Sequence, residues 1–203
     1  MKIFCIGRNK TGTTSLEIAL KSLGFRMGNQ AQGEMLLDDW ARRDFRRIVT
    51  LCKTADAFQD VPFSMPWTFQ ALDLAFPGSR FILTVRDTPD DWYQSLIRFH
   101  TKIVGKCRIP TADDLRDFNY RYKGFLWRSA QINYGVNEHT LYNKELYTGH
   151  YMWHNQMVMN YFVFRPQDLL VLNLKDSESM LKLCNFLQVP YTGQSMPHEN
   201  KSG

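Results

Sequence analysis

The first 24 residues constrain the fold of this chain more than any other segment. A short apolar run from Ile3 to Ile6 is followed by a glycine-containing stretch at 7–15, and a helical pattern then opens near Thr14 and stops at Gly24. A buried strand, a glycine loop and a helix in this order form the first half of a βαβ unit. The segment therefore predicts a parallel sheet with helices packed against it.

The rest of the sequence continues this alternation of strands and helices. Further strands are expected at 56–58, 81–85 and 169–174, and the second of these is mostly apolar, as in a buried parallel strand. Helices are expected at 34–52, 66–76, after Pro89, at 145–164 and at 177–187, and the stretch 100–145 has the least regular pattern. The alternation predicts an α/β fold, a parallel sheet flanked by helices, in a single domain over residues 1–203.

The composition narrows the class of ligand. The net charge of +5 and the pI near 9.0 favour an anionic ligand, which leaves nucleic acid, an acidic membrane face and a nucleotide open. No run of five Lys or Arg residues occurs, so nucleic-acid binding is the weaker reading. The four cysteines form no C-x-x-C pair, and no apolar run approaches the length of a membrane span. With no signal-peptide pattern at the start, we expect a cytoplasmic protein without a membrane span.

The loop at 7–15 has the features of a phosphate-binding loop. Gly7 and Gly12 let the backbone curl so that successive N–H groups point inward, and the following helix adds partial positive charge. The glycines match the G-x-x-x-x-G-K-[ST] loop of nucleoside triphosphatases, but Thr13 stands at its lysine position. The lysine lies inside the loop instead, at Lys10, where it would reach a shorter 5′ group than a triphosphate.

The stretch Gly7-Arg8-Asn9-Lys10-Thr11-Gly12-Thr13-Thr14-Ser15-Leu16 resembles the 5′-phosphosulfate loop of the sulfotransferase family that uses 3′-phosphoadenosine 5′-phosphosulfate (PAPS). The family's second signature is a strand that ends in Arg, with a Ser on the following helix. Phe81–Arg86 and Ser95 are similar to it, with a separation of nine between Arg86 and Ser95, one residue longer than the family spacing. The closing strand and helix and the ending Pro197-His198-Glu199-Asn200 resemble those of soluble bacterial-type members. The likeness extends from residue 3 to about residue 200.

The resemblance implies the P-loop nucleoside-triphosphatase-like fold of the sulfotransferases and a set of donor contacts without a metal. The loop residues expected to bind the 5′ end of PAPS, or of its product PAP, are Arg8, Lys10, Thr11, Gly12, Thr13, Thr14 and Ser15. Arg86 and Ser95 would bind the 3′-phosphate and so select PAPS over ATP. Lys10 would also act in catalysis, by neutralising the bridging oxygen of the leaving nucleotide.

Asp60 is the candidate general base. It precedes Val61-Pro62, where cytosolic members of the family place a catalytic His before a residue and a proline. A carboxylate there could accept the proton of the acceptor's hydroxyl group, but an ordinary Asp is a weak base and would need burial to raise its pKa. The alternative interpretation is that Asp60 caps the next helix.

Two other functions stay open, and the acceptor is not determined. A small-molecule kinase would share the fold but needs a lysine where Thr13 stands, and a non-catalytic nucleotide-binding module would also explain the basic pI. The acceptor is expected to be a small molecule or a carbohydrate with a hydroxyl or amine group. The aromatic residues between 92 and 164 are either core or part of a pocket, and the oligomeric state is not predicted.

Overall fold

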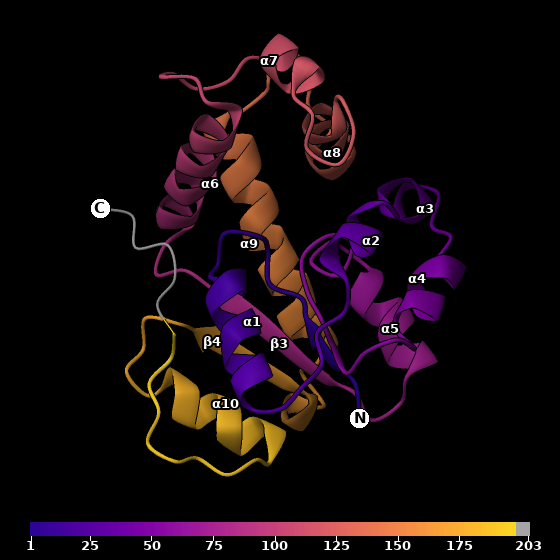
Figure 1. Cartoon of the computed structure of the whole chain (residues 1–203), viewed down its shortest axis with the longest axis vertical. Helices are drawn as coiled ribbons and strands as arrows, with labels where there is room; N and C mark the ends of the chain where they lie inside the picture. The colour runs from indigo at the N-terminus through magenta and orange to yellow at the C-terminus, as the bar shows by residue number, and fades with distance from the viewer. Residues whose placement is uncertain (198–203) are drawn as a thin grey trace. The chain divides into compact units, whose positions relative to one another are not determined.

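A computed structural model describes residues 1–197 of the chain (Figure 1). These residues group into two compact units, one formed by Met1–Asp87 with the chain from Asn155 onward, and the other by Thr88–His154. Two compact units can belong to one folding domain, so the single domain expected over residues 1–203 stays a prediction.

The first unit is built on a parallel sheet of four strands in the order β2-β1-β3-β4. The strands are β1 (Ile3–Cys5), β2 (Ala57–Phe58), β3 (Arg80–Val85) and β4 (Leu169–Asn173). In register, Ile3 of β1 lies between Ala57 of β2 and Arg80 of β3. The chain thus places β2 on one side of β1 and β3 on the other, which makes the carboxyl ends of β1 and β3 a topological switch point. Ligands of open α/β sheets bind at such points.

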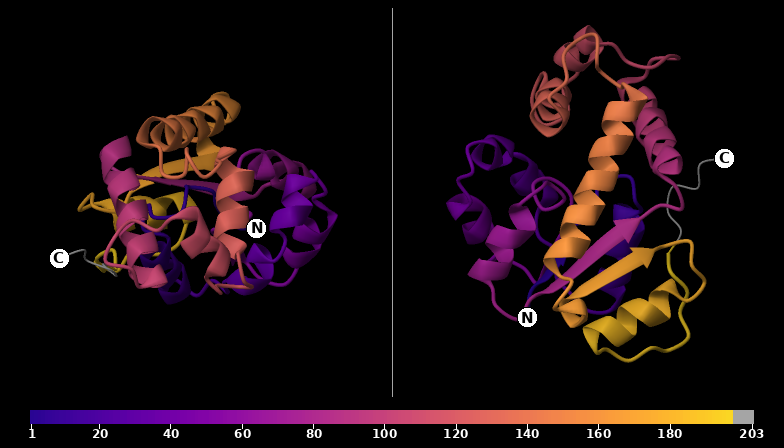
Figure 2. Two further views of the ribbon diagram at one scale, coloured as in Figure 1. Left: turned by 90° about the horizontal axis from the view of Figure 1, so that it is seen from above. Right: turned by 180° about the vertical axis from the view of Figure 1, so that it is seen from behind.

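Helices cover both faces of this sheet, because successive residues of β1 point in opposite directions (Figures 1 and 2). Ile3 and Cys5 join a buried apolar cluster with α1 (Thr13–Ser22) and α10 (Ser179–Leu187). On the other face, Phe4 packs against a group of aromatic rings that extends to α5 (Thr68–Ala75) and to the end of α9 (Lys144–Tyr161). A short 3₁₀ turn, Pro166–Asp168, leads into β4. The α/β fold with a parallel sheet flanked by helices is therefore confirmed.

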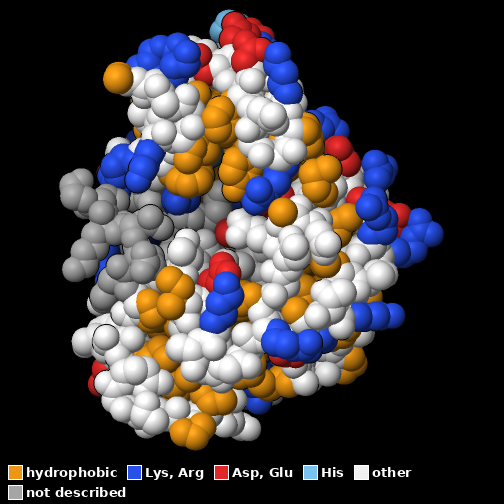
Figure 3. Space-filling view, in the orientation of Figure 1, with side chains coloured by type: hydrophobic (Ala, Val, Ile, Leu, Met, Phe, Trp, Pro, Cys, Tyr) orange, Lys and Arg blue, Asp and Glu red, His pale blue; other side chains and the backbone are white. Residues whose placement is uncertain are grey.

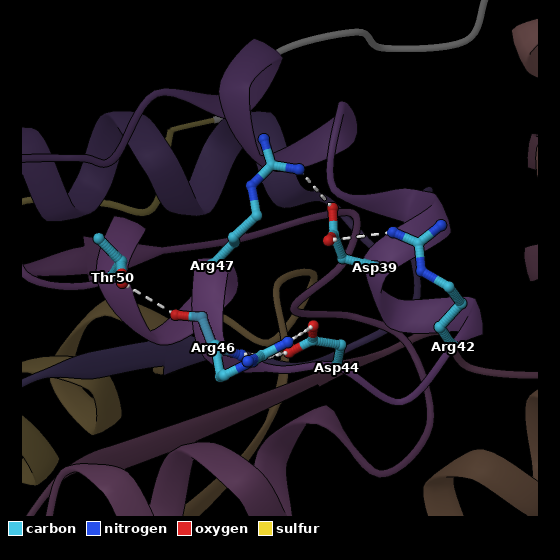
Figure 4. Close-up of polar contacts among 6 residues, drawn as sticks. All are labelled: Asp39, Arg42, Asp44, Arg46, Arg47 and Thr50. Carbon is cyan, nitrogen blue, oxygen red and sulfur yellow. Dashed lines mark hydrogen bonds and ion pairs between the residues drawn. The ribbon is translucent and has the colours of Figure 1, made fainter.

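The prediction of one continuous helix over residues 34–52 is wrong. The segment instead forms three short helices, α2 (Gln30–Glu34), α3 (Leu37–Ala41) and α4 (Arg46–Leu51). Arg43 has a φ of 59°, which no α-helix allows, and its guanidinium group lies 4.2 Å and 4.1 Å from the ring centroids of Trp40 and Trp67. Ion pairs complete this corner, as Figure 4 shows: Asp39 with Arg42 and Arg47, and Asp44 with Arg46.

The second unit contains α6 (Pro89–Val104), α7 (Ala112–Asp117), α8 (Phe125–Tyr134) and the first part of α9. The helix α6 begins where the sequence predicts it, because the Thr88 side chain accepts a hydrogen bond from the Asp91 N–H and Pro89 occupies the first turn. Aromatic side chains pack on one another here, with the rings of Trp92 and Tyr151 stacked at 4.7 Å. Several of them are buried core residues, among them Trp92, Tyr142, Tyr147 and Tyr151.

The lengths of the helices and the charges on the surface relate to the expectation of a cytoplasmic protein without a membrane span. No helix among residues 1–197 is long and apolar enough to cross a membrane. On the face shown in Figure 3, Lys and Arg side chains lie in several separate groups with acidic and apolar side chains between them. The cytoplasmic location stays a prediction.

Candidate active site

The loop between β1 and α1 has a backbone that only glycine permits at two points. A Cβ atom on Gly7 would lie 2.5 Å from the backbone N and O of Thr84 in β3, closer than real side chains approach. Gly12 has a φ of 101° and is the N-cap residue of α1. Lys10 also has a positive φ, at 69°. The loop therefore curls tightly over the carboxyl end of the sheet, as its glycine spacing predicts.

Thr11 fixes this curl from inside. Its hydroxyl group donates to the carbonyl oxygen of Arg8 at 2.6 Å and lies 2.5 Å from the hydroxyl oxygen of Thr84. The Thr11 side chain is buried, so its hydroxyl serves the loop itself. Any contact of Thr11 with a ligand would come from its backbone N–H.

The N-terminus of α1 is suited to an anion. Within residues 1–197 no side chain caps this end of the helix, and its first turn holds no acidic residue. The first helical N–H groups belong to Thr13, Thr14 and Ser15, and they carry the positive end of the helix dipole. The side chain of Thr14 is exposed, whereas those of Thr13 and Ser15 are buried.

Arg86 joins this loop from the neighbouring strand. It follows directly after β3, and its Nε donates to the carbonyl oxygen of Lys10 at 2.8 Å. Both side chains are partly exposed. The Arg86 side chain therefore contacts the backbone of Lys10, a residue 76 positions earlier in the chain, beside the carboxyl ends of β1 and β3.

Ser95 lies on α6 in the second unit and is only 8% exposed. It is therefore not a solvent-facing helix residue. Its contact with the same phosphate as Arg86 stays a prediction.

Asp60 lies in a turn just after β2, with a φ of 56°, and its carbonyl oxygen accepts a hydrogen bond from the Ser64 N–H at 2.7 Å. It does not cap the following helix, because α5 begins at Thr68 with Trp67 at its N-cap position. The residue is 9% exposed, and its Oδ1 has no hydrogen-bond partner among the described residues. That oxygen is itself buried, so only a group that enters this turn could donate to it.

Burial, followed by the charge of Glu34, raises the pKa of Asp60 to about 7. The charge of Lys10 and a hydrogen bond with Thr13 oppose the rise, while Glu17 adds a smaller contribution upward. Charged and polar groups of the loop and of α1 thus affect the ionisation of Asp60. A carboxyl group with this pKa is matched to general-base work near neutral pH.

Arg8 turns inward from the loop. It is only 2% exposed, and its Nη1 donates to the carbonyl oxygen of Ser64 at 3.1 Å. The N–H of Ser64 donates to the carbonyl oxygen of Asp60, so Ser64 belongs to the turn that carries Asp60. Arg8 therefore connects the loop at 7–15 to that turn. Its expected contact with the nucleotide stays a prediction.

The structure shows no cluster of three or more His, Cys, Asp or Glu residues that could hold a metal ion within residues 1–197. The four cysteines are free, and burial raises the pKa of the Cys5 thiol beneath the loop. His198 and Asn200, from the ending that resembles other family members, lie outside the described residues.

Two residues of this region were not predicted from the sequence as site residues. Thr84 is a polar residue inside an otherwise apolar strand, directly before Val85 and Arg86, and this interruption could have drawn attention to it. Glu34 is one carboxylate among several in a polar stretch, and nothing in its spacing marks it. Only the packing of α2 reveals that it is buried.

The comparison with protein families agrees with this geometry. The chain matches the sequence model of the family described as Sulfotransferase domain over residues 2–203. The protein therefore belongs to the sulfotransferase domain family, a class of enzymes that transfer sulfonate groups. A search of curated proteins found no match.

Proposed function

We propose that this protein transfers the sulfonate group of PAPS to a hydroxyl or amine group of a small-molecule or carbohydrate acceptor and releases PAP. The observation that carries the proposal is the 2.8 Å hydrogen bond from Arg86 to the backbone of Lys10. PAPS has anionic groups at both its 5′ and 3′ positions, so a protein that selects it needs cations from two places in the chain at one site.

The loop suits the 5′ end of such a donor. The N–H groups from Thr11 to Ser15 and the positive end of α1 would hold the 5′-phosphate, helped by the Thr13 and Thr14 hydroxyl groups. The absence of an acidic residue from the first turn of α1 supports this assignment. Arg86 and Ser95 would hold the 3′-phosphate.

Bound PAPS would supply an activated sulfonate group for in-line displacement. A bond forms between the acceptor oxygen and sulfur while the bond from sulfur to the 5′-phosphate oxygen of PAP breaks. Lys10 would stabilise the negative charge that develops on that leaving oxygen. Asp60 would take the proton of the acceptor's hydroxyl group on its carboxylate.

The alternative functions predict different ligands. A small-molecule kinase would bind ATP with magnesium, and Thr13 at the usual lysine position argues against it. A non-catalytic module would bind polyanions with a steep dependence on salt and would transfer nothing.

The test is incubation with ³⁵S-labelled PAPS and a panel of phenols, alcohols, amines and saccharides, with PAP release as the readout. We expect acceptor-dependent PAP release, and a rise in the unfolding temperature with PAP that exceeds the rise with ATP and magnesium. Stabilisation by ATP and magnesium alone, with no PAP release from PAPS, would overturn the proposal in favour of the kinase.

A further inference from the structure

A surface cavity lies beside the carboxyl-terminal end of α6, within the second unit. Its volume is about 360 Å³, which falls in the range of small-molecule sites. Ile97 forms part of its wall and is only 8% exposed, so the cavity has an apolar surface. The wall also carries the basic side chains of Arg98, Lys102 and Lys106, and among residues 1–197 no acidic side chain lines it. The cavity therefore combines an apolar surface with positive charge.

The turn that ends α6 forms one side of this cavity. Gly105 is the C-cap residue and has a φ of 72°, which glycine adopts without strain. The chain reverses there, so that Lys106 and Cys107 line the same cavity as the last turns of the helix. Asp114 of α7 holds this segment, with its carboxylate 2.6 Å from Arg108 and 3.7 Å from Lys106. The closer contact is to Arg108, so the charge of Lys106 is less compensated.

Arg98 and Lys102 are four residues apart on α6 and line the same cavity. Both are exposed, and neither has an ion pair or a side-chain hydrogen bond with another of residues 1–197. Like charges at this spacing repel each other and destabilise a helix slightly. The helix dipole favours a cation in the last turn, which accounts for Lys102 but not for Arg98, one turn earlier. A bound anion would remove the repulsion.

We propose that this cavity binds a small organic anion with an apolar body, of the class of aryl sulfates and aryl carboxylates. Arg98 and Lys102 would hold the anionic group, with Lys106 from the turn after the helix, and the apolar body would lie on Ile97. A guanidinium group suits the planar or tetrahedral oxygens of such anions, because it can donate two parallel hydrogen bonds. The proposal does not depend on sulfonate transfer by this protein.

Cys107 provides a local measurement of ligand binding. It lines the cavity and is exposed, whereas the other three cysteines are buried. Iodoacetamide, an uncharged reagent, should therefore alkylate Cys107 first, and mass spectrometry follows the rate. The test is this rate in the native protein with increasing 2-naphthyl sulfate. We expect alkylation to slow by about fivefold at saturation, because a ligand that fills the cavity covers the thiol.

Variants of the basic residues test the charge directly, each compared with its own rate without ligand. Arg98→Gln and Lys102→Gln should each raise the 2-naphthyl sulfate concentration for half protection by about tenfold, as the loss of a charged hydrogen bond predicts. Lys102→Arg keeps the charge and should keep the protection. The matched control is Lys53→Gln, at an exposed lysine of the first unit, which should change nothing. Uncharged 2-naphthol should protect far less than the sulfate.

Three results would overturn the proposal. They are no protection by either 2-naphthyl sulfate or 2-naphthoate, equal protection by 2-naphthol, and unchanged half protection in both Arg98→Gln and Lys102→Gln. Inorganic sulfate should protect weakly, and protection equal to that by 2-naphthyl sulfate would contradict the apolar part of the site. None of these measurements uses PAP release, so a failure here leaves the proposed transferase function untouched.

Discussion

The guanidinium group of Arg86 donates a hydrogen bond from Nε to the backbone carbonyl oxygen of Lys10 at 2.8 Å. The bond joins the end of β3 to the loop after β1, across the switch point of the sheet. The bond therefore fixes the guanidinium group of Arg86 beside the backbone of the loop.

Replacing Lys10 should mainly lower turnover, and replacing Arg86 should mainly weaken nucleotide binding. We expect Lys10→Ala to lower kcat by about a hundredfold with little change in PAP affinity, because its charge acts on the leaving oxygen. We expect Arg86→Ala to weaken PAP binding by about ten- to a hundredfold, as the loss of charged hydrogen bonds predicts. Calorimetry with PAP and steady-state kinetics measure the two effects.

The control for this pair is Arg86→Lys, which keeps the charge but cannot bond the Lys10 carbonyl and a phosphate with the same planar group. It should bind PAP with intermediate affinity. Equal losses of turnover and binding in both alanine variants would contradict the division of roles.

The rate of transfer should depend on the ionisation of Asp60. Its pKa of about 7 means that the carboxylate is mostly protonated below pH 7, so kcat/KM should fall as the pH drops through that value. Asp60→Asn should lose most of the activity, and its remaining activity should lack this acid limb. A profile of the native enzyme that stays flat from pH 5 to 8 would argue against Asp60 as the base.

The same shift makes Asp60 a source of instability at neutral pH. Its pKa rises from the usual 3.8 to about 7 on folding, so the folded state binds more protons between these values and stability falls as the pH rises through them. We expect Asp60→Asn to be more stable than the native protein at pH 8, by about 2–4 kcal/mol. Urea unfolding at several pH values measures this difference, which should disappear below pH 4, where Asp60 is protonated in both states.

Gly7 should tolerate no side chain. The Cβ atom of Gly7→Ala would overlap Thr84 of β3, so we expect a loss of about 1–3 kcal/mol in the free energy of unfolding and a disturbed loop. The control is Gly149→Ala, within α9, where a Cβ would meet nothing within 4 Å. That variant should be more stable by about 1 kcal/mol, because alanine favours the helix. Equal stability of the two variants would contradict the close approach of the loop to β3.

Local chemistry in the sequence determined the parallel strands, the glycine loop and the two cation-bearing motifs. An apolar run needs burial wherever it lies, and a glycine at a left-handed position needs only its own backbone, so these features follow from neighbouring residues. The helix expected at 34–52 failed for the opposite reason. At its break, Arg43 packs over Trp67, a ring from another part of the chain that the local sequence pattern does not reveal.

The tertiary structure alone decided how the site works. It placed Arg86 on the backbone of Lys10, turned Arg8 inward to Ser64, and put Asp60 in a buried turn near Glu34. Each of these depends on contacts between residues far apart in the chain. The pKa of a carboxyl group depends on its burial and on the charges around it, and these exist only once the chain has folded.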